Sequence, residues 1–66
     1  MRITLNGEAQ EIAGAMTVEA LLRSFDLEPK KVAVERNLEI VRRSEFGRLM
    51  IEDGDRLEIV HFIGGG

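Results

Sequence analysis

Residues 57–66 read Leu57-Glu58-Ile59-Val60-His61-Phe62-Ile63-Gly64-Gly65-Gly66, and the rest of the chain is best understood from this stretch outward. Its β-branched and aromatic residues predict a strand, and three glycines follow without a polar spacer. Glycine lacks a Cβ, so such a tail adopts almost any backbone conformation, fits a channel too narrow for side chains and leaves a terminal carboxylate unhindered. We therefore expect the strand to anchor a flexible tail whose working group is the carboxylate of Gly66. The alternative interpretation is a frayed end or an expression scar.

The size and composition of the chain limit its function. It has 66 residues, of which 44% are hydrophobic and 32% charged, and this predicts one small folded domain. The net charge is −3, with Lys and Arg dispersed, so nucleic acid is an unfavoured partner. The sequence contains no apolar run of membrane-spanning length, and its first residues do not resemble a signal peptide. We expect a cytoplasmic protein that has no membrane partner.

Two hairpins are predicted before the last strand. Side chains alternate around Asn6-Gly7, a type I′ turn signal, which predicts a hairpin over residues 1–12 with an edge strand as its second arm. Val32–Arg36 and Glu39–Val41, joined at Asn37, predict the second hairpin.

One amphipathic helix is predicted between the hairpins. Thr17 is a candidate N-cap, and Pro29 predicts that the helix stops near residues 26–27. Apolar residues recur at the i, i+3, i+4, i+7 spacing of one helix face, namely Val18, Leu21, Leu22 and Phe25. We expect this face to form the core rather than to bind a partner helix.

The segment after the second hairpin gives weaker signals. Ser44 is a candidate cap for a single helical turn that ends at Gly47, and a short apolar segment follows at residues 49–51. Arg42 and Arg43 fit a solvated loop, or alternatively a pair that faces acidic groups of a protein partner.

The predicted order of elements is β-β-α-β-β-β, which favours an α+β fold with one mixed sheet and the helix packed across one face. Because side chains alternate along a strand, Leu57 and Ile59 should face the helix, while Val60 and Phe62 should lie on the open face. Two apolar side chains beside the tail suggest a docking surface for a partner. A register error that would bury them is the alternative.

The side chains give little support for an enzyme active site or a metal site. The chain has no cysteine, so a disulfide, a thiolate metal site and a redox thiol are all excluded. His61 is the only histidine, and we expect it to be a strand residue at the rim of the sheet. The remaining group is the terminal carboxylate, a weak electrophile until adenylation by a partner enzyme prepares it for a nucleophile.

The chain resembles the ThiS family of sulfur carriers in thiamine biosynthesis, which are ubiquitin-like β-grasp proteins, over essentially its whole length. The segments that carry the resemblance are Asn6-Gly7, Thr17-Val18 with Leu21-Leu22, Val32–Asn37 with Glu39–Val41, and above all residues 53–66. The resemblance implies a β-grasp domain over residues 1–63, followed by a flexible glycine tail at residues 64–66.

The resemblance also implies a chemistry for the tail. A ThiF-like activating enzyme would use ATP to adenylate Gly66, sulfur from a cysteine persulfide would replace AMP to give a thiocarboxylate, and a ThiG-like thiazole synthase would accept the sulfur. Gly65 and Gly66 match the Gly-Gly of the family, and Gly64 extends it. The protein would be a co-substrate with no bound cofactor, and would contact its partners through Gly64, Gly65, Val60 and Phe62. The Gly-Gly ending is shared with other proteins, so carriers for molybdopterin or cysteine synthesis and ubiquitin-like modifiers are the alternatives.

Overall fold

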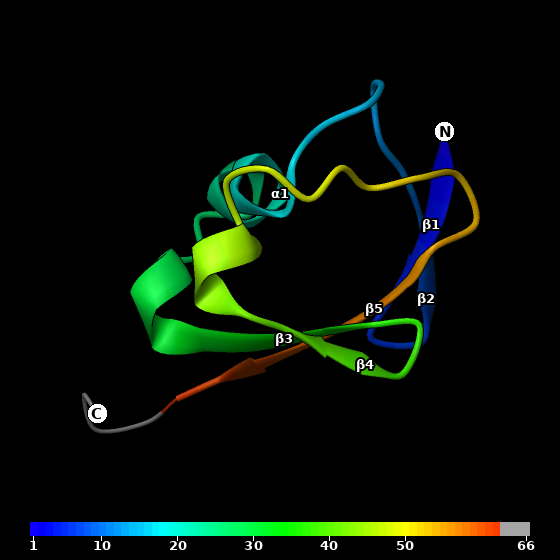
Figure 1. Ribbon diagram of the computed structural model, residues 1–66. Helices are drawn as coiled ribbons and strands as arrows, with labels where there is room; N and C mark the ends of the chain where they lie inside the picture. The colour runs from blue at the N-terminus through cyan, green and yellow to red at the C-terminus, as the bar shows by residue number, and fades with distance from the viewer. Residues whose placement is uncertain (63–66) are drawn as a thin grey trace.

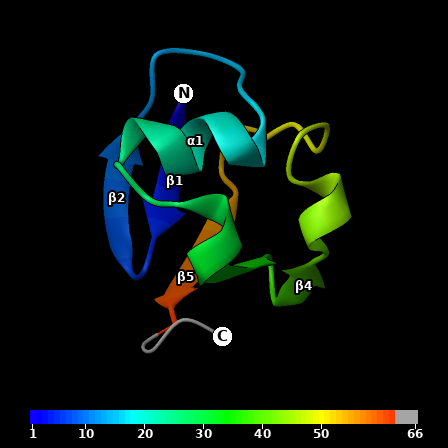
Figure 2. The ribbon, with the colours of Figure 1, turned by 90° about the vertical axis from the view of Figure 1, so that its left-hand side faces the viewer.

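The computed structural model describes residues 1–62, in which one helix crosses one face of a five-stranded sheet (Figures 1 and 2). The elements are β1 (Arg2–Leu5), β2 (Glu8–Glu11), α1 (Val18–Ser24), β3 (Val32–Arg36), β4 (Glu39–Val41) and β5 (Arg56–His61), with single 3-10 turns η1 (Pro29–Lys31) and η2 (Arg43–Glu45). The strand order is β2-β1-β5-β3-β4, and β5 is parallel to β1 and antiparallel to β3. The predicted α+β class and order of elements are therefore confirmed. Within residues 1–62, no helix has the length and apolar character needed to cross a membrane.

Both hairpins turn through two residues with positive φ. Asn6 (49°) and Gly7 (84°) join β1 to β2, and Asn37 (51°) and Leu38 (71°) join β3 to β4. Positive φ at both central residues is the type I′ pattern, whose right-handed twist matches that of the strands. The first turn is the predicted one, and β2 is an edge strand as expected. The second turn places a leucine where glycine is usually found.

Helix α1 begins where the sequence predicts. The Thr17 Oγ1 accepts a hydrogen bond from the Ala20 backbone N–H at 3.1 Å, which satisfies one of the free donors of the first turn. Val18, Leu21 and Leu22 are fully buried, so the predicted core face is confirmed for these three residues.

The prediction that Phe25 completes the buried face of α1 is wrong. The helix ends at Ser24, slightly before the predicted stop, and Phe25 at the C-cap is 40% exposed. Phe25 itself has left the helical conformation, with φ −102° and ψ 14°, and the chain then turns through Asp26, whose φ is 60°.

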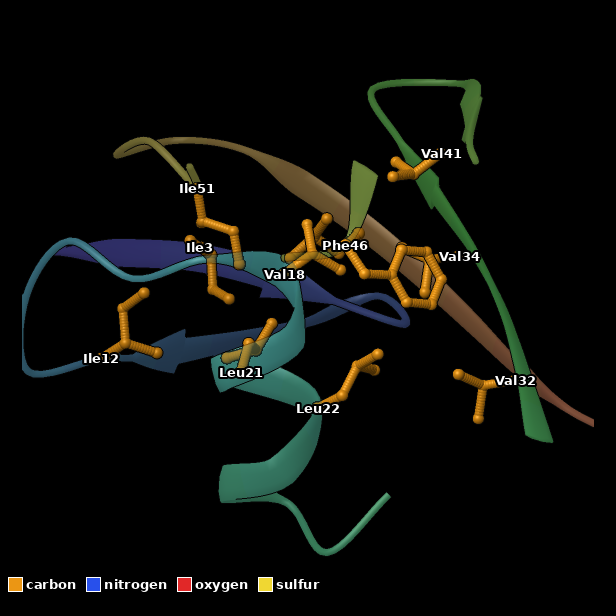
Figure 3. Packing of buried hydrophobic residues seen from close by; sticks show 11 residues of the cluster. Ile3, Ile12, Val18, Leu21, Leu22, Val32, Val34, Val41, Phe46 and Ile51 are labelled. Atoms are coloured by element: carbon orange, nitrogen blue, oxygen red, sulfur yellow. The ribbon is translucent and has the colours of Figure 1, made fainter. Parts of the chain in front are cut away.

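The core lies between α1 and the sheet, where side chains from the helix and the strands converge (Figure 3). Its buried hydrophobic residues are Ile3, Ile12, Val18, Leu21, Leu22, Val32, Val34, Val41, Phe46, Ile51 and Leu57. All strands except β2 contribute to this set. A domain of this size is stable by only about 3–10 kcal/mol, so truncating one of the large core side chains, which costs about 2–5 kcal/mol, would come close to unfolding it.

The segment between β4 and β5 packs against the start of α1. The Val18 N–H donates to the Leu49 carbonyl at 3.0 Å, and the Ile51 N–H donates to the Met16 carbonyl at 2.9 Å. The apolar segment predicted at residues 49–51 thus covers the entry to the helix, although it does not join the sheet as a strand.

The single turn that precedes this segment differs from the predicted one. Ser44 is not its cap: η2 begins after Arg42, and no side chain caps it. Both Arg42 and Arg43 are exposed, as expected of a surface loop. The Arg43 guanidinium also donates to the carbonyls of Pro29 and Val32 at 3.3 and 3.4 Å, so it connects η2 to the start of β3.

Candidate functional site

Strand β5 lies at the centre of the sheet and carries the chain toward its end (Figure 1). It pairs with β3 along its last five residues and with β1 at its first two. The Phe62 N–H donates to the Lys31 carbonyl at 2.8 Å, so the hydrogen-bonded ladder continues one residue beyond His61. The last residue that the structure describes is therefore held by the sheet. The predicted tail residues Gly64, Gly65 and Gly66 lie outside the described residues, and their roles stay predictions.

Two asparagine side chains complete the hydrogen bonds of β5. Asn6, in the turn after β1, accepts from the Ile59 N–H at 2.7 Å and donates to the Ile59 carbonyl at 3.2 Å. On the other side of the strand, the Asn37 side chain accepts from the Arg56 N–H at 2.9 Å. Each amide thus acts as a strand partner where the neighbouring strand has already turned away. The sequence predicts both asparagines as turn residues but gives no sign of this second role.

A buried carboxylate fixes the beginning of β5. Asp55 is only 5% exposed and accepts hydrogen bonds from the Arg36 Nε at 2.8 Å, the Asn37 Nδ2 at 3.1 Å and the Glu52 backbone N–H at 2.9 Å. Burial alone would raise the pKa of Asp55, but these hydrogen bonds and the Arg36 charge outweigh it and hold the pKa below its ordinary value.

Sequence reasoning missed the Asp55 cluster and treated Asp55 as part of a turn. A signal was present, because Arg36 falls on the buried face of β3, two residues after Val34. A guanidinium on that face needs a buried anion. Asp55 thus holds the residue before β5 in place, and pairing with β3 holds the strand up to its last residue.

The face of the sheet opposite α1 carries exposed apolar side chains. Val60 is 62% exposed and Phe62 is 44% exposed, which confirms that both lie outside the core. Ala33 pairs directly with Val60 across the sheet, and Ile40 on β4 is 76% exposed. We call these four residues, Ala33, Ile40, Val60 and Phe62, the open-face patch. Sequence reasoning missed Ile40, although alternation with the buried Val41 would have placed it there.

The described side chains offer no site for metal chemistry. Among residues 1–62, no group of three or more His, Asp or Glu side chains could hold a metal ion. His61 is the exposed last residue of β5, as expected for a strand residue at the rim. The features that the structure brings together are instead a central strand paired with its neighbours and an apolar open face beside the end of that strand.

Comparison with known proteins identifies the family. The model of the ThiS family matches residues 3–66, which include the three terminal glycines. The chain belongs to the ThiS family. It is 48% identical over 50 residues to the sulfur carrier protein ThiS of Bacillus subtilis, with 76% of each chain covered. A crystal structure of the thiamine biosynthesis protein ThiS from Geobacter metallireducens covers all of both chains, with a TM-score of 0.85 and 33% identity. The fold described above is therefore the β-grasp fold of ThiS.

One further relative of this ThiS-family chain is a much longer protein. A thiazole synthase from Paramagnetospirillum magneticum is 53% identical over all 66 residues, but the chain spans only 20% of its length. That protein thus contains a ThiS-like segment together with a large additional part.

Proposed function

We propose that this ThiS-family chain is a sulfur carrier protein of thiamine biosynthesis, a co-substrate that partner enzymes load and unload. The observation that carries the proposal is the family match over residues 3–66, which includes the glycine ending. The central position of β5 supports it, because β1 and β3 hold the start of the strand and β3 pairs with it up to its last residue, which gives the tail a fixed starting point. The exposed surface beside that point leaves room for an enzyme to approach.

The proposed chemistry takes place at the carboxylate of Gly66. A ThiF-like enzyme transfers AMP from ATP to this carboxylate, which turns one carboxylate oxygen into part of a good leaving group. The outer sulfur of a cysteine persulfide then attacks the acyl carbon and displaces AMP, which gives an acyl disulfide. A thiol reductant supplies the two electrons that cleave its S–S bond, so the carrier ends as a thiocarboxylate and the donor cysteine as a thiol. A residue without a Cβ leaves the carbonyl carbon open to attack and can enter a narrow active site. The chain itself binds no cofactor in this scheme.

The proposed acceptor of the sulfur is a ThiG-like thiazole synthase. Support comes from the Paramagnetospirillum magneticum thiazole synthase, whose own chain includes a segment 53% identical to the whole of this one. Joining a carrier to its acceptor turns their encounter into an intramolecular step with a high effective concentration. A fusion of this kind is useful only if the two parts act on each other.

We further propose that Val60, Phe62, Gly64 and Gly65 contact the partner enzymes. Val60 and Phe62 are exposed apolar groups next to the start of the tail, so a partner that threads the tail also covers them. Gly64 and Gly65 then serve as the side-chain-free segment that enters the active site.

Changing the length of the tail tests the proposal. Deleting Gly66, or adding one residue after it, moves the carboxylate by about 3.5 Å, which is more than a near-attack geometry tolerates. We expect sulfur transfer in a reaction reconstituted with an activating enzyme, a sulfur donor and a synthase to be abolished. Thermal unfolding should stay that of the wild type. Wild-type transfer by either variant would refute the role of the terminal residue, and a ladder of covalent protein conjugates would instead indicate a modifier.

A further inference from the structure

Two carboxylates face each other on the open side of the sheet. Glu35 on β3 pairs directly with Glu58 on β5, and both side chains are exposed. Like charges directly opposite each other destabilise a sheet. The ion pairs formed among residues 1–62 include neither carboxylate, and they also leave out Arg56, which lies on the same face two residues before Glu58. Within residues 1–62, neither carboxylate of this like-charged pair is therefore held in an ion pair.

Apolar groups of the open-face patch surround the two carboxylates. Ile40 pairs directly with Glu35 across β3 and β4, and Val60 follows Glu58 on the same face. These four side chains line a shallow depression of about 470 Å³ on the sheet. A protein that covered Ile40 and Val60 would therefore also take water away from the two carboxylates. Removing water from an unpaired charge is costly, so such a partner has to supply a cation.

We propose that this depression receives an arginine or lysine of the activating enzyme, placed between Glu35 and Glu58, while apolar side chains around it cover Ile40 and Val60. This inference rests on the proposed function. A guanidinium has donors enough to bridge two carboxylates in one plane, so arginine fits the site better than lysine. The contact between the enzyme's cation and the two carboxylates then supplies recognition, and the apolar side chains around it supply contact area.

The activating enzyme is the partner that most needs this recognition. A glycine tail has no side chains, so it cannot distinguish this carrier from another protein with the same ending. The choice has to be made on the folded domain, and it has to be made before ATP is consumed. A specific charged contact on a rigid sheet meets that need, because a carrier without the two carboxylates would leave the cation of the enzyme unpaired.

Adenylation kinetics test the inference. The double variant Glu35→Gln with Glu58→Gln keeps the shape of both side chains and removes their charge. The matched control is Glu8→Gln with Glu28→Gln, which makes the same change in net charge at two exposed positions away from the depression. The assay is ATP–pyrophosphate exchange by the ThiF-like enzyme of the same organism, at low and at physiological salt. We expect the KM for the Glu35/Glu58 variant to rise at least tenfold with kcat unchanged, and its salt dependence to weaken. The control should change less than twofold.

The possible failures are distinguishable. If the wild-type chain supports no exchange, the proposed function fails and the inference fails with it. If the wild type is adenylated and the two double variants have equal KM values and equal salt dependence, the inference alone is wrong. Weakened binding to the thiazole synthase, or loss of self-association, with unchanged adenylation would also overturn it, because the depression would then belong to a different occupant. Equal thermal unfolding of both variants excludes a folding defect as the cause of a raised KM.

Discussion

Leu38 holds a backbone conformation that its side chain disfavours. Its φ is 71° and it is 88% exposed, so no burial offsets the strain. A left-handed conformation costs a residue with a Cβ about 1–2 kcal/mol. Glycine avoids this cost, but part of the gain in stability is lost because glycine has more conformational freedom in the unfolded state. We expect Leu38→Gly to raise the free energy of unfolding by up to about 1 kcal/mol in urea titrations.

The first hairpin offers a matched control for this prediction. Gly7 occupies the corresponding turn position with a φ of 84°, and a Cβ built there would meet no atom within 4 Å. Gly7→Leu should therefore destabilise the fold by about 1–2 kcal/mol through backbone strain alone. Destabilisation by Leu38→Gly would show that the leucine makes stabilising contacts that outweigh its strain.

Asp55 makes the stability of the fold depend on pH. Its pKa in the folded chain lies below its ordinary value, because the three hydrogen bonds that its carboxylate accepts and the charge of Arg36 outweigh the effect of burial. The unfolded chain binds this proton more readily, near a pKa of about 3.9, so the contribution is complete above that pH and is lost as the pH falls through the folded pKa. Asp55→Asn should cost about 2–3 kcal/mol at pH 7 and flatten the loss of stability below about pH 4. Urea unfolding at pH 7 and pH 3 measures both effects, and an unchanged acid response would contradict this role of Asp55.

The sequence predicts side-chain roles well only where the partners are close along the chain. The sequence predicts Thr17 as a cap because its side chain accepts from a backbone N–H only three residues away. The hydrogen bonds of Asp55 to Arg36 and Asn37 span 19 and 18 residues, and those of Asn6 to Ile59 span 53. Such contacts depend on which strands pair, which local patterns do not contain.

Side chains along β5 alternate between the core and the open face of the sheet. Leu57 faces the core and is 1% exposed, whereas Val60 and Phe62 lie outside it. The sequence predicted this division because the period of two is a local property. The predicted stop near residues 26–27 depends on Pro29, and it lies slightly beyond the observed end at Ser24, where Phe25 is the C-cap.

Val60 on β5 and Phe62 directly after the strand should be needed for docking and not for folding. Val60→Asp or Phe62→Asp places an unpaired charge in the proposed apolar contact, so affinity for the activating enzyme or the synthase should fall at least about tenfold. The free energy of unfolding should change by only about 0.5 kcal/mol, because both positions are exposed. Titration calorimetry with each partner measures the affinity.

Phe25→Asp is the control for Phe62→Asp. It makes the same chemical change at a phenylalanine of similar exposure, 40% against 44%, at the end of α1. Equal affinities of the two variants for both partners would show that Phe62 does not dock.

The whole molecule has one covered and one open face, with the last strand at its centre (Figure 2). The sequence predicted the class of fold, because one helix and five strands leave few ways to build a core. The strand order could not be predicted, since β1 pairs with β5 across about fifty residues of sequence. The consequence for function is that the strand leading to the tail is held by β1 and β3 at its start and by β3 up to its last residue.

The central claim is that this scaffold presents a carboxylate for exchange of oxygen by sulfur. The most direct test is the intact mass of the chain after incubation with ATP, a ThiF-like enzyme, a persulfide sulfur source and a thiol reductant. We predict a mass gain equal to the difference between one sulfur and one oxygen atom, located at Gly66 by fragmentation and absent when ATP is omitted. A chain whose mass stays unchanged in the complete reaction would contradict the account.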